Sequence, residues 1–299
     1  MKDIAASVTG RLQNKAKERG RPFGEVLQYY AIERLLYRLS KSSYANDFVL
    51  KGALLFFGWG LATIRPTRDI DFRGYIHHSP ETVEAVFREI CETSVEPDGM
   101  IFDATSIRSQ IIQEDNQYHG MRVRFQARLG KAVLPIQIDI GFSDKIEPKA
   151  IMLEYPTWLD FSVPVLRSYA PETVVAEKFE ALIALGLVNS RLKDFYDLYT
   201  LSNAFDFDGG VLSRALSTTF ETRQTILPEG LPEGFSSSFI EANQTQWKAF
   251  LRRISVNSDL ALASVIEQLK TFLLPPLNAV QTGKPFDYKW EKGNDWRSR

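Results

Sequence analysis

Two aspartates separated by one isoleucine, at Asp69-Ile70-Asp71, form the strongest chemical signal in the sequence. Successive side chains of a β-strand point to opposite faces, so both carboxylates would project from one face while Ile70 and Phe72 enter the other. Carboxylates this close repel each other, and a divalent cation is the usual compensation; Mg²⁺ also binds the phosphate oxygens of a substrate. The pattern predicts a metal-binding pair, and the alternative is a charged strand end at the surface.

A third aspartate follows the same alternation in a second segment. Isoleucines occupy positions 136, 138 and 140, which leaves Asp139 on the opposite face of a strand. If this strand neighbours the first one, three carboxylates converge in the arrangement that holds metal ions around a phosphoryl or nucleotidyl transfer. The alternative is a polar residue on a solvated face.

A lysine interrupts the apolar stripe of a helix predicted over residues 168–186. At 100° per residue, Lys178 falls between Leu182 and Leu185 on the helical wheel. Burying an ammonium group without a partner is costly. Either the lysine stem extends past the core to reach water, or the amine meets an anion such as a nucleotide triphosphate.

Two aspartates lie three residues apart in the helix predicted over residues 191–205. Asp194 borders the apolar face of that helix, so it is a candidate for acting on an attacking hydroxyl or for orienting Lys178. Asp197 lies further from the apolar face. We expect Asp197 to cap, to pair with a basic neighbour on its own helix or to face solvent.

Three arginines alternate along the segment MRVRFQARL. A strand here would present Arg122, Arg124 and Arg128 on one face. They would hold phosphates of a nucleic acid, or they would protect a solvated edge strand by their charge.

The elements that carry these residues fall into two parts with different character. Alternation and apolar spacing predict a strand-rich part over residues 1–165 and a mostly helical part over residues 166–299. The first part has helices at 24–40 and 81–94, a helix or turn over 48–60 that leads into a strand at 65–76, and further strands at 101–113, 120–129 and 134–144. The second has helices at 168–186, 191–205, 211–224, 236–253 and 258–273, a break at Pro275-Pro276 and a tail of low order from 285.

Composition narrows the class of protein. The chain has 299 residues, a net charge of −1 and 44% hydrophobic residues, as in ordinary globular proteins. Cys91 is its one cysteine, so an internal disulfide is excluded and a reducing compartment is expected. No apolar run reaches the length of a membrane helix, and the N-terminal segment lacks the apolar core of a signal peptide. We therefore expect a cytoplasmic protein without a membrane partner.

Several common catalytic motifs are missing from the sequence. Three histidines and one cysteine offer no zinc-ligand spacing. The phosphate-binding loop G-x-x-x-x-G-K-[ST], the G-x-S-x-G elbow and the protein-kinase signatures do not occur. These absences argue against structural zinc, P-loop ATP hydrolysis and acyl transfer.

The motifs together, in their order, resemble the AbiEii/AbiGii toxin family of nucleotidyltransferases. The resemblance extends from the N-terminal helix to about Leu201 and rests on five segments, namely Lys51-Gly52, 65–71 (RPTRDID), 137–141 (QIDIG), 176–178 (AEK) and 191–198 (RLKDFYDL). It implies a DNA-polymerase-β-like nucleotidyltransferase fold, which is a mixed sheet flanked by helices, with a largely helical C-terminal region. It also implies the toxin of a type IV toxin–antitoxin or phage abortive-infection system.

The resemblance assigns roles to five residues. Asp69 and Asp71 would bind Mg²⁺, with Asp139 as the third carboxylate. Lys178 would contact the triphosphate of an NTP, and Asp194 would be the catalytic acid of the last motif. The resemblance also implies a cognate AbiEi-type antitoxin encoded nearby and, by similarity to the related MenT toxins, transfer of a nucleotide to the 3′ end of tRNA.

One position departs from the usual pattern. Nucleotidyltransferases commonly carry Gly-Ser at the start of the first motif, whereas this sequence has Gly52-Ala53. The hydroxyl that would meet phosphate is missing. Backbone N–H groups at Gly52, the Lys51 ammonium or the Thr67 hydroxyl would supply the contact instead.

Two other functions use the same residues. A small-molecule transferase, such as an antibiotic nucleotidyltransferase or phosphotransferase, would apply the same metal chemistry to another acceptor. A non-catalytic module would keep the fold and bind nucleotide or RNA without turnover.

Overall fold

The computed structural model describes residues 3–61, 67–114, 118–142, 145–186, 191–254, 256 and 259–298. The chain forms two compact units: Met1–Ser143 with Ile151–Ser168, and Asp144–Ala150 with Tyr169–Arg299. The second unit thus includes a short segment that precedes the division predicted at residue 165. The motif residues Arg65 and Pro66 lie outside the described ranges.

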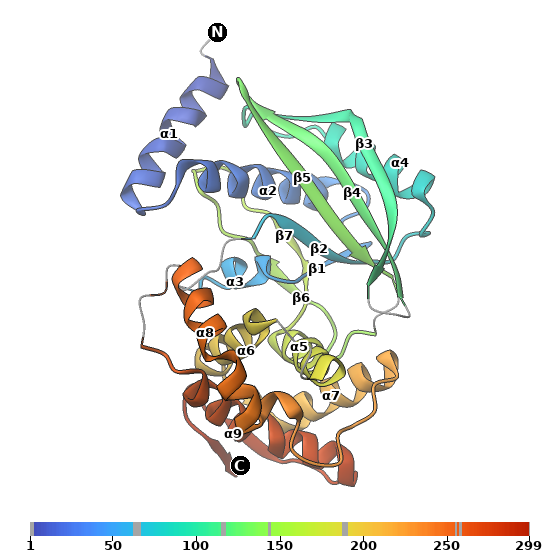
Figure 1. Cartoon of the computed structure of the whole chain (residues 1–299). Helices are drawn as coiled ribbons and strands as arrows, with labels where there is room; N and C mark the ends of the chain where they lie inside the picture. The colour runs from blue at the N-terminus through green and yellow to red at the C-terminus, as the bar shows by residue number, and fades with distance from the viewer. Residues whose placement is uncertain are drawn as a thin grey trace. The chain divides into compact units, whose positions relative to one another are not determined.

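The first unit is built on a seven-stranded mixed sheet with the strand order β3-β4-β5-β2-β1-β7-β6 (Figure 1). β2 runs parallel to β5 and β1 runs parallel to β7, whereas the other neighbouring strands are antiparallel. The strands are β1 Phe48–Lys51, β2 Asp69–Gly74, β3 Met100–Glu114, β4 Tyr118–Leu129, β5 Ala132–Gly141, β6 Ile151–Glu154 and β7 Val165–Ser168. This mixed sheet with its helices confirms the predicted fold class.

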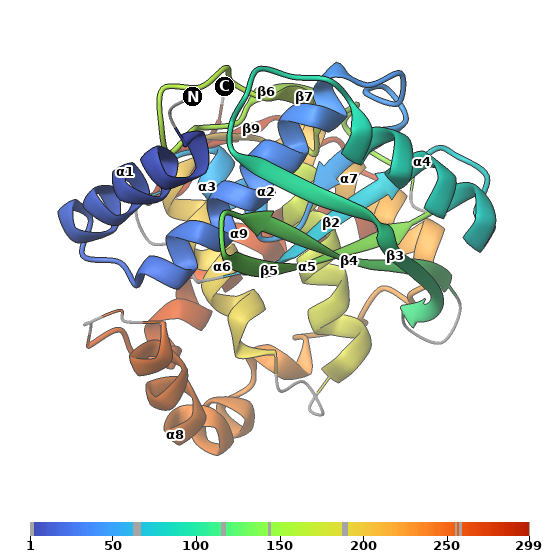
Figure 2. The ribbon, with the colours of Figure 1, turned by 90° about the horizontal axis from the view of Figure 1, so that it is seen from above.

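Helices flank the sheet of the first unit (Figures 1 and 2). They are α1 Ile4–Glu18, α2 Phe23–Lys41, α3 Leu54–Gly58 and α4 Pro80–Glu92. α4 packs on β3 and β4, and α2 contacts β5 and β7. The Phe48 ring centroid lies 5.5 Å from that of Phe72 on β2 and 5.5 Å from that of Phe87 on α4. The face of β2 that carries Ile70 and Phe72 is therefore the core face, as the alternation predicts.

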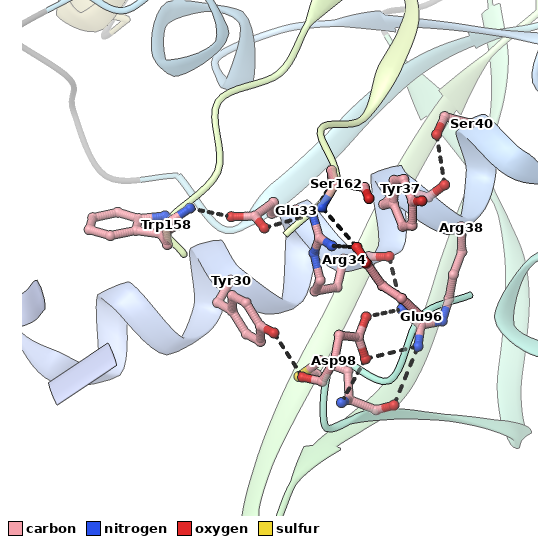
Figure 3. A network of polar contacts seen from close by, with 11 residues as sticks. Tyr30, Glu33, Arg34, Tyr37, Arg38, Ser40, Glu96, Asp98, Trp158 and Ser162 are labelled. Atoms are coloured by element: carbon pink, nitrogen blue, oxygen red, sulfur yellow. Dashed lines mark hydrogen bonds and ion pairs between the residues drawn. The ribbon is translucent and has the colours of Figure 1, made fainter. Parts of the chain in front are cut away.

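α2 is more deeply buried than an amphipathic helix, since every residue from Val26 to Leu39 is buried. Its charged residues therefore need partners inside the protein (Figure 3). Arg38 donates from Nη1 to Oδ2 of Asp98 at 2.7 Å and from Nη2 to Oδ1 at 3.1 Å. Glu33 accepts a hydrogen bond from the Trp158 backbone N–H at 2.7 Å. These contacts join α2 to the segments that precede β3 and β7.

The second unit is mainly helical. Its helices are α5 Pro171–Leu185, α6 Leu192–Ala204, α7 Gly209–Arg223, the 3₁₀ turn η3 Glu233–Phe235, α8 Ser237–Arg253 and α9 Leu262–Thr282. A small sheet of order β10-β9-β8 is formed by β8 Phe207–Asp208, β9 Tyr288–Trp290 and β10 Trp296–Ser298. Within the described ranges of both units, no helix combines the length and the apolar character that crossing a membrane requires.

The predicted break at the two prolines and the predicted tail of low order are both wrong, and one contact links the two errors. α9 continues through Pro275 and Pro276. Pro276 has no N–H for the carbonyl of Phe272, and that carbonyl instead accepts a hydrogen bond from Trp296 Nε1 at 3.0 Å. A residue of the C-terminal sheet therefore supplies the hydrogen bond that Pro276 cannot donate within α9.

Near residue 50 the structure contains a strand that the prediction lacks. We expected a helix or turn over residues 48–60 leading into a strand, and α3 followed by β2 agrees, but β1 precedes α3. The apolar run has no clear period, and the burial of β1 inside the sheet favours the extended form.

Candidate functional site

The three predicted aspartates lie on two adjacent strands of the first unit. Asp69 and Asp71 share one face of β2, and Asp71 is the direct cross-strand partner of Asp139 on β5. Lys51 on β1 is the partner of Asp71 on its other side. The parallel pairing of β2 with β5 thus brings the two motifs together, as the matching alternation predicts. We call Asp69, Asp71 and Asp139 the aspartate group.

Gly52 lies directly against this group. It forms the turn after β1 with a φ of +74°, a conformation that favours glycine. A Cβ atom at this position would overlap Oδ2 of Asp71 and lie 2.7 Å from its Cγ. Only glycine therefore fits between the turn and the Asp71 carboxylate. Ala53 follows in the same turn, and a phosphate contact by this turn stays a prediction.

Asp139 is bound by an arginine from the neighbouring strand. Arg122 on β4 faces Asp139 in register, and its Nε and Nη2 each donate to one carboxylate oxygen at 2.7 Å. The Asp139 residue is 8% exposed. Such a two-point contact fixes the orientation of the carboxylate and balances its charge.

Asp69 has a different environment. It is exposed, and its Oδ1 accepts a hydrogen bond from Gln137 Nε2 at 3.0 Å. Gln137 in turn accepts from Arg124 Nε at 2.8 Å. A chain of contacts thus runs from β4 through β5 to β2 and orients Asp69 through a neutral amide. β4 lies between β3 and β5, so the interpretation of its arginines as protection of an edge strand is wrong.

A Mg²⁺ ion fits the chemistry of two of these aspartates. Asp69 and Asp71 offer carboxylate oxygens on one face, the first exposed and the second half-buried. Mg²⁺ is commonly held by one or two carboxylates together with water and substrate phosphates. Among the residues that the structure describes, no group of three or more His, Cys, Asp or Glu side chains is arranged to bind a metal ion. Asp139 as a third ligand therefore stays a prediction, and Arg122 is its observed partner.

The two further residues predicted to contact the nucleotide take different positions. Lys51 is 8% exposed and lies beside Asp71 in the sheet. Thr67 is half-buried two residues before β2, and its backbone N–H donates to the Tyr29 hydroxyl at 3.3 Å. Lys51 is thus next to the aspartate group across the sheet, and Thr67 is next to it along the chain. Contact of either residue with phosphate stays a prediction.

The last predicted motifs meet in the second unit. Lys178 on α5 contacts two aspartates of α6, with its Nζ 2.7 Å from Asp194 Oδ1 and 2.7 Å from Asp197 Oδ2. The lysine side chain is 14% exposed, and those of Asp194 and Asp197 are 6% and 2% exposed. Of the two explanations for a lysine in an apolar stripe, the contact with an anion is confirmed, and the anions are carboxylates of the same chain.

The expectation that Asp197 could face solvent is wrong, and its pairing with Arg191 or Lys193 stays a prediction. Asp197 is buried and binds Lys178 as closely as Asp194 does. The three-residue spacing turns both carboxylates toward α5, since residues three apart share a helix face. The cluster of one lysine and two aspartates carries a formal charge of −1, so the ammonium is already balanced within the unit. Contact of Lys178 with a triphosphate and a catalytic role of Asp194 stay predictions.

Sequence reasoning missed the side chains that orient the aspartates. Gln137 and Arg122 belong to the site through cross-strand contacts. The signal was present, because the arginines of MRVRF and the polar residues of IQIDI alternate in the same way. Only the pairing of β4 with β5 makes that alternation a set of contacts.

The chain matches a protein family and is similar to solved structures. A family model described as nucleotidyl transferase AbiEii toxin, type IV TA system, matches residues 34–277. The crystal structure of JHP933 from Helicobacter pylori is similar, with 14% identity, a TM-score of 0.46 and coverage of 87% of this chain and 94% of that one. A proposed nucleotidyltransferase from H. pylori has 13% identity, a TM-score of 0.46 and coverage of 87% and 98%. A search of curated proteins found no match.

Proposed function

Because this chain belongs to the AbiEii family of nucleotidyltransferase toxins from type IV toxin–antitoxin systems, we propose that it transfers a nucleotide from an NTP to the 3′ end of tRNA. The observation that carries the proposal is the pair of an exposed Asp69 and a half-buried Asp71 on one strand face, with Gly52 against Asp71 and Asp139 in register beside it. Such a face can hold phosphate and metal close to the protein backbone.

In this proposal, Asp69 and Asp71 hold Mg²⁺. The ion, when bound, stabilises the negative charge that develops on the phosphate oxygens. The side chains of the first unit orient the acids: Gln137 fixes Asp69, and Arg122 fixes Asp139. Catalysis would come mainly from position and electrostatics, as in other phosphoryl-transfer enzymes.

In the reaction the oxygen of the tRNA 3′-hydroxyl attacks the α-phosphorus of the NTP, and the hydroxyl proton passes to water. The bond between the α-phosphorus and the bridging oxygen breaks, and pyrophosphate leaves. Lys178 would contact the triphosphate by donating a hydrogen bond to it, with Asp194 and Asp197 holding its ammonium in place. The sequence left two roles for Asp194, acting on the attacking hydroxyl or orienting Lys178. Because Asp194 is already bound to Lys178, we assign it the second role.

The test is a transfer assay with purified protein, Mg²⁺, tRNA and each α-labelled NTP in turn. The wild type should label tRNA with one NTP, and Asp69→Ala should not. The matched control is Asp160→Ala, which changes an exposed aspartate that pairs with Arg11 at 3.1 Å and lies outside the aspartate group. Label on a small amine or alcohol but not on tRNA would support the small-molecule transferase. NTP binding without any transfer would support the binding module.

The proposed biological role is a toxin countered by a cognate AbiEi-type antitoxin encoded nearby, acting in the cytoplasm and in phage defence. Expression of the wild-type chain should then arrest growth of its bacterial host. Asp69→Ala should relieve the arrest at equal protein level, as judged by immunoblot. A harmless wild type that raises drug tolerance would contradict the role.

A further inference from the structure

A basic pocket lies in the second unit, between the first turn of α6 and the last two turns of α8. Its volume is about 450 Å³. Three cationic side chains line it, those of Arg191, Lys193 and Arg253, together with the amide of Gln246. Among the described residues that line it, none is acidic. We call this feature the α6–α8 pocket.

The base of the α6–α8 pocket belongs to the core of the second unit. Leu192 and Phe250 line the pocket and are 5% and 6% exposed. The Phe250 ring centroid lies 5.8 Å from that of Tyr196 and 5.6 Å from that of Trp247. Trp247 Nε1 donates to the carbonyl of Leu260 at 2.7 Å. Packing on both helices therefore fixes the shape of the pocket.

The charge distribution of the pocket favours an anion. The N-terminal end of a helix carries a partial positive charge, so acidic residues are the usual neighbours there. α6 does have Asp194 in its first turn, but it also has Lys193 there and Arg191 at its N-cap, without a side-chain cap. The aspartates of the same helix are directed to Lys178. Cations of two helices thus gather around one depression, which an anion would stabilise.

Phosphate is the anion that matches these side chains. An arginine fork donates two parallel hydrogen bonds to phosphate, and the Gln246 amide adds a neutral donor. Arg253 lies with its guanidinium carbon 5.8 Å from the centre of the Phe250 ring, so the base of the pocket also positions this cation. All three cationic residues and Gln246 are exposed. An open pocket of exposed cations suits a backbone phosphate of a long polyanion better than a nucleotide that must be enclosed.

We propose that the α6–α8 pocket binds a backbone phosphate of the RNA acceptor. The second unit would thereby hold the acceptor with residues that have no part in the aspartate group. The identity of the acceptor rests on the proposed function, but the assignment of a phosphate site does not require turnover. Contacts of this kind fix where a nucleic acid lies and contribute affinity without reading its sequence.

The test compares two neighbouring arginines of α8 in the full-length protein. Arg253→Glu reverses a charge inside the pocket, whereas Arg252→Glu makes the same change at an exposed position that does not line it. Binding of fluorescein-labelled tRNA is measured by anisotropy without NTP at several salt concentrations. Arg253→Glu should weaken binding about tenfold or more and lower the salt slope by about one, and Arg252→Glu should weaken it less than about threefold.

Three outcomes would overturn the inference. Equal weakening by the two variants would indicate general charge attraction. Unchanged tRNA binding by Arg253→Glu would remove the phosphate site. Loss of NTP binding in calorimetry with tRNA binding retained would assign the pocket to the donor. If Arg253→Glu lowers the melting temperature, Arg253→Gln and Arg252→Gln give the same comparison without charge reversal.

The two proposals fail in different ways. A wild type that binds tRNA through Arg253 but transfers no nucleotide would contradict the proposed function and support the phosphate site. If the wild type labels tRNA and Arg253→Glu still binds tRNA normally, the proposed function is supported and the phosphate site is contradicted.

Discussion

Two aspartates of the first unit, Asp98 and Asp69, have different surroundings. Asp98 is 2% exposed, and both of its oxygens accept hydrogen bonds from Arg38, while the Met100 N–H adds a third. Asp69 is exposed and accepts a hydrogen bond from the neutral amide of Gln137. A carboxylate enclosed by an arginine fork stabilises the fold. A carboxylate that faces solvent beside a neutral donor remains accessible to a ligand.

Asp139 lies between these two extremes. It shares the strand register of Asp71, but it is bound by Arg122 in the same two-point geometry that joins Arg38 to Asp98. Residue type and register thus place three aspartates together. Burial and hydrogen bonding distinguish them, because Asp139 is buried and bound by an arginine whereas Asp69 is exposed and bound by a neutral amide. Variants that remove one acid at a time can test whether this distinction also separates function from stability.

The largest expected effect comes from Asp71→Asn. This change keeps the shape of the side chain and removes the charge, so transfer to tRNA should fall by about 10³-fold or more. The free energy of unfolding should change by less than about 1 kcal/mol, because Asp71 is half-buried and repulsion by the neighbouring acids offsets attraction by Lys51 across the sheet. The transfer assay and urea denaturation measure the two quantities, with Asp160→Asn as the control. If Asp71→Asn instead lowers the free energy of unfolding as much as Asp98→Asn is expected to, by about 3 kcal/mol or more, then Asp71 is a structural acid like Asp98.

Asp98→Asn should show the opposite behaviour. It leaves the buried Arg38 guanidinium without a charged partner, which typically costs about 3 to 5 kcal/mol of stability. The rate of transfer per folded molecule should stay unchanged. Urea denaturation measures the free energy of unfolding, and the transfer assay at low temperature measures the rate per folded molecule. Replacing both partners in Arg38→Met/Asp98→Asn should recover part of the stability, since no buried charge then remains unpaired, and a further loss would contradict the pair as the cause.

The sequence predicts the sheet positions well because alternation reports which face of a strand is buried. Ile70 and Phe72 do lie in the core, and Asp71 and Asp139 are in register. The same reasoning fails where long-range contacts decide. The carbonyl of Phe272 is satisfied by Trp296, 24 residues away, and no local pattern announces that partner.

The helical part shows the same limit for the site. The wheel places Lys178 in an apolar stripe, which leaves either a path to water or an anion as partner, and it does not identify the anion. Packing of α5 against α6 supplies both Asp194 and Asp197. Sequence therefore predicts that a charge needs a partner, whereas the fold determines which partner it has.

The buried network along α2 also predicts a pH dependence of stability. Burial raises the pKa of Glu33 from its ordinary value of 4.5 to about 7, although the Arg34 guanidinium opposes this shift. Between these two values the unfolded chain has lost the proton that the folded protein keeps. Stability should therefore decline as the pH rises from about 4.5 to 7, by up to about 3 kcal/mol. Urea denaturation across this range measures the decline.

The control for this pH dependence lies on the same helix. Glu33→Gln should flatten the decline, because the amide does not titrate. Glu25→Gln, which changes a glutamate of α2 that pairs with Arg21, should leave the decline in place. A wild type whose stability rises between pH 4.5 and 7 would show that Glu33 is held in its ionised form by Arg34.

The smallest expected effect, from Arg122→Lys, tests the intermediate position of Asp139. Lysine keeps the charge but cannot form the two parallel hydrogen bonds of the guanidinium. We expect transfer to fall about tenfold and stability by about 1 kcal/mol, since Asp139 loses its fixed orientation. If Asp139 acts only through its position, Asp139→Asn should lower kcat similarly, and neither variant should change the Mg²⁺ concentration for half-maximal rate. A large rise of that concentration in Asp139→Asn alone would show that Asp139 binds the metal and that the Arg122 contact is exchanged during the reaction.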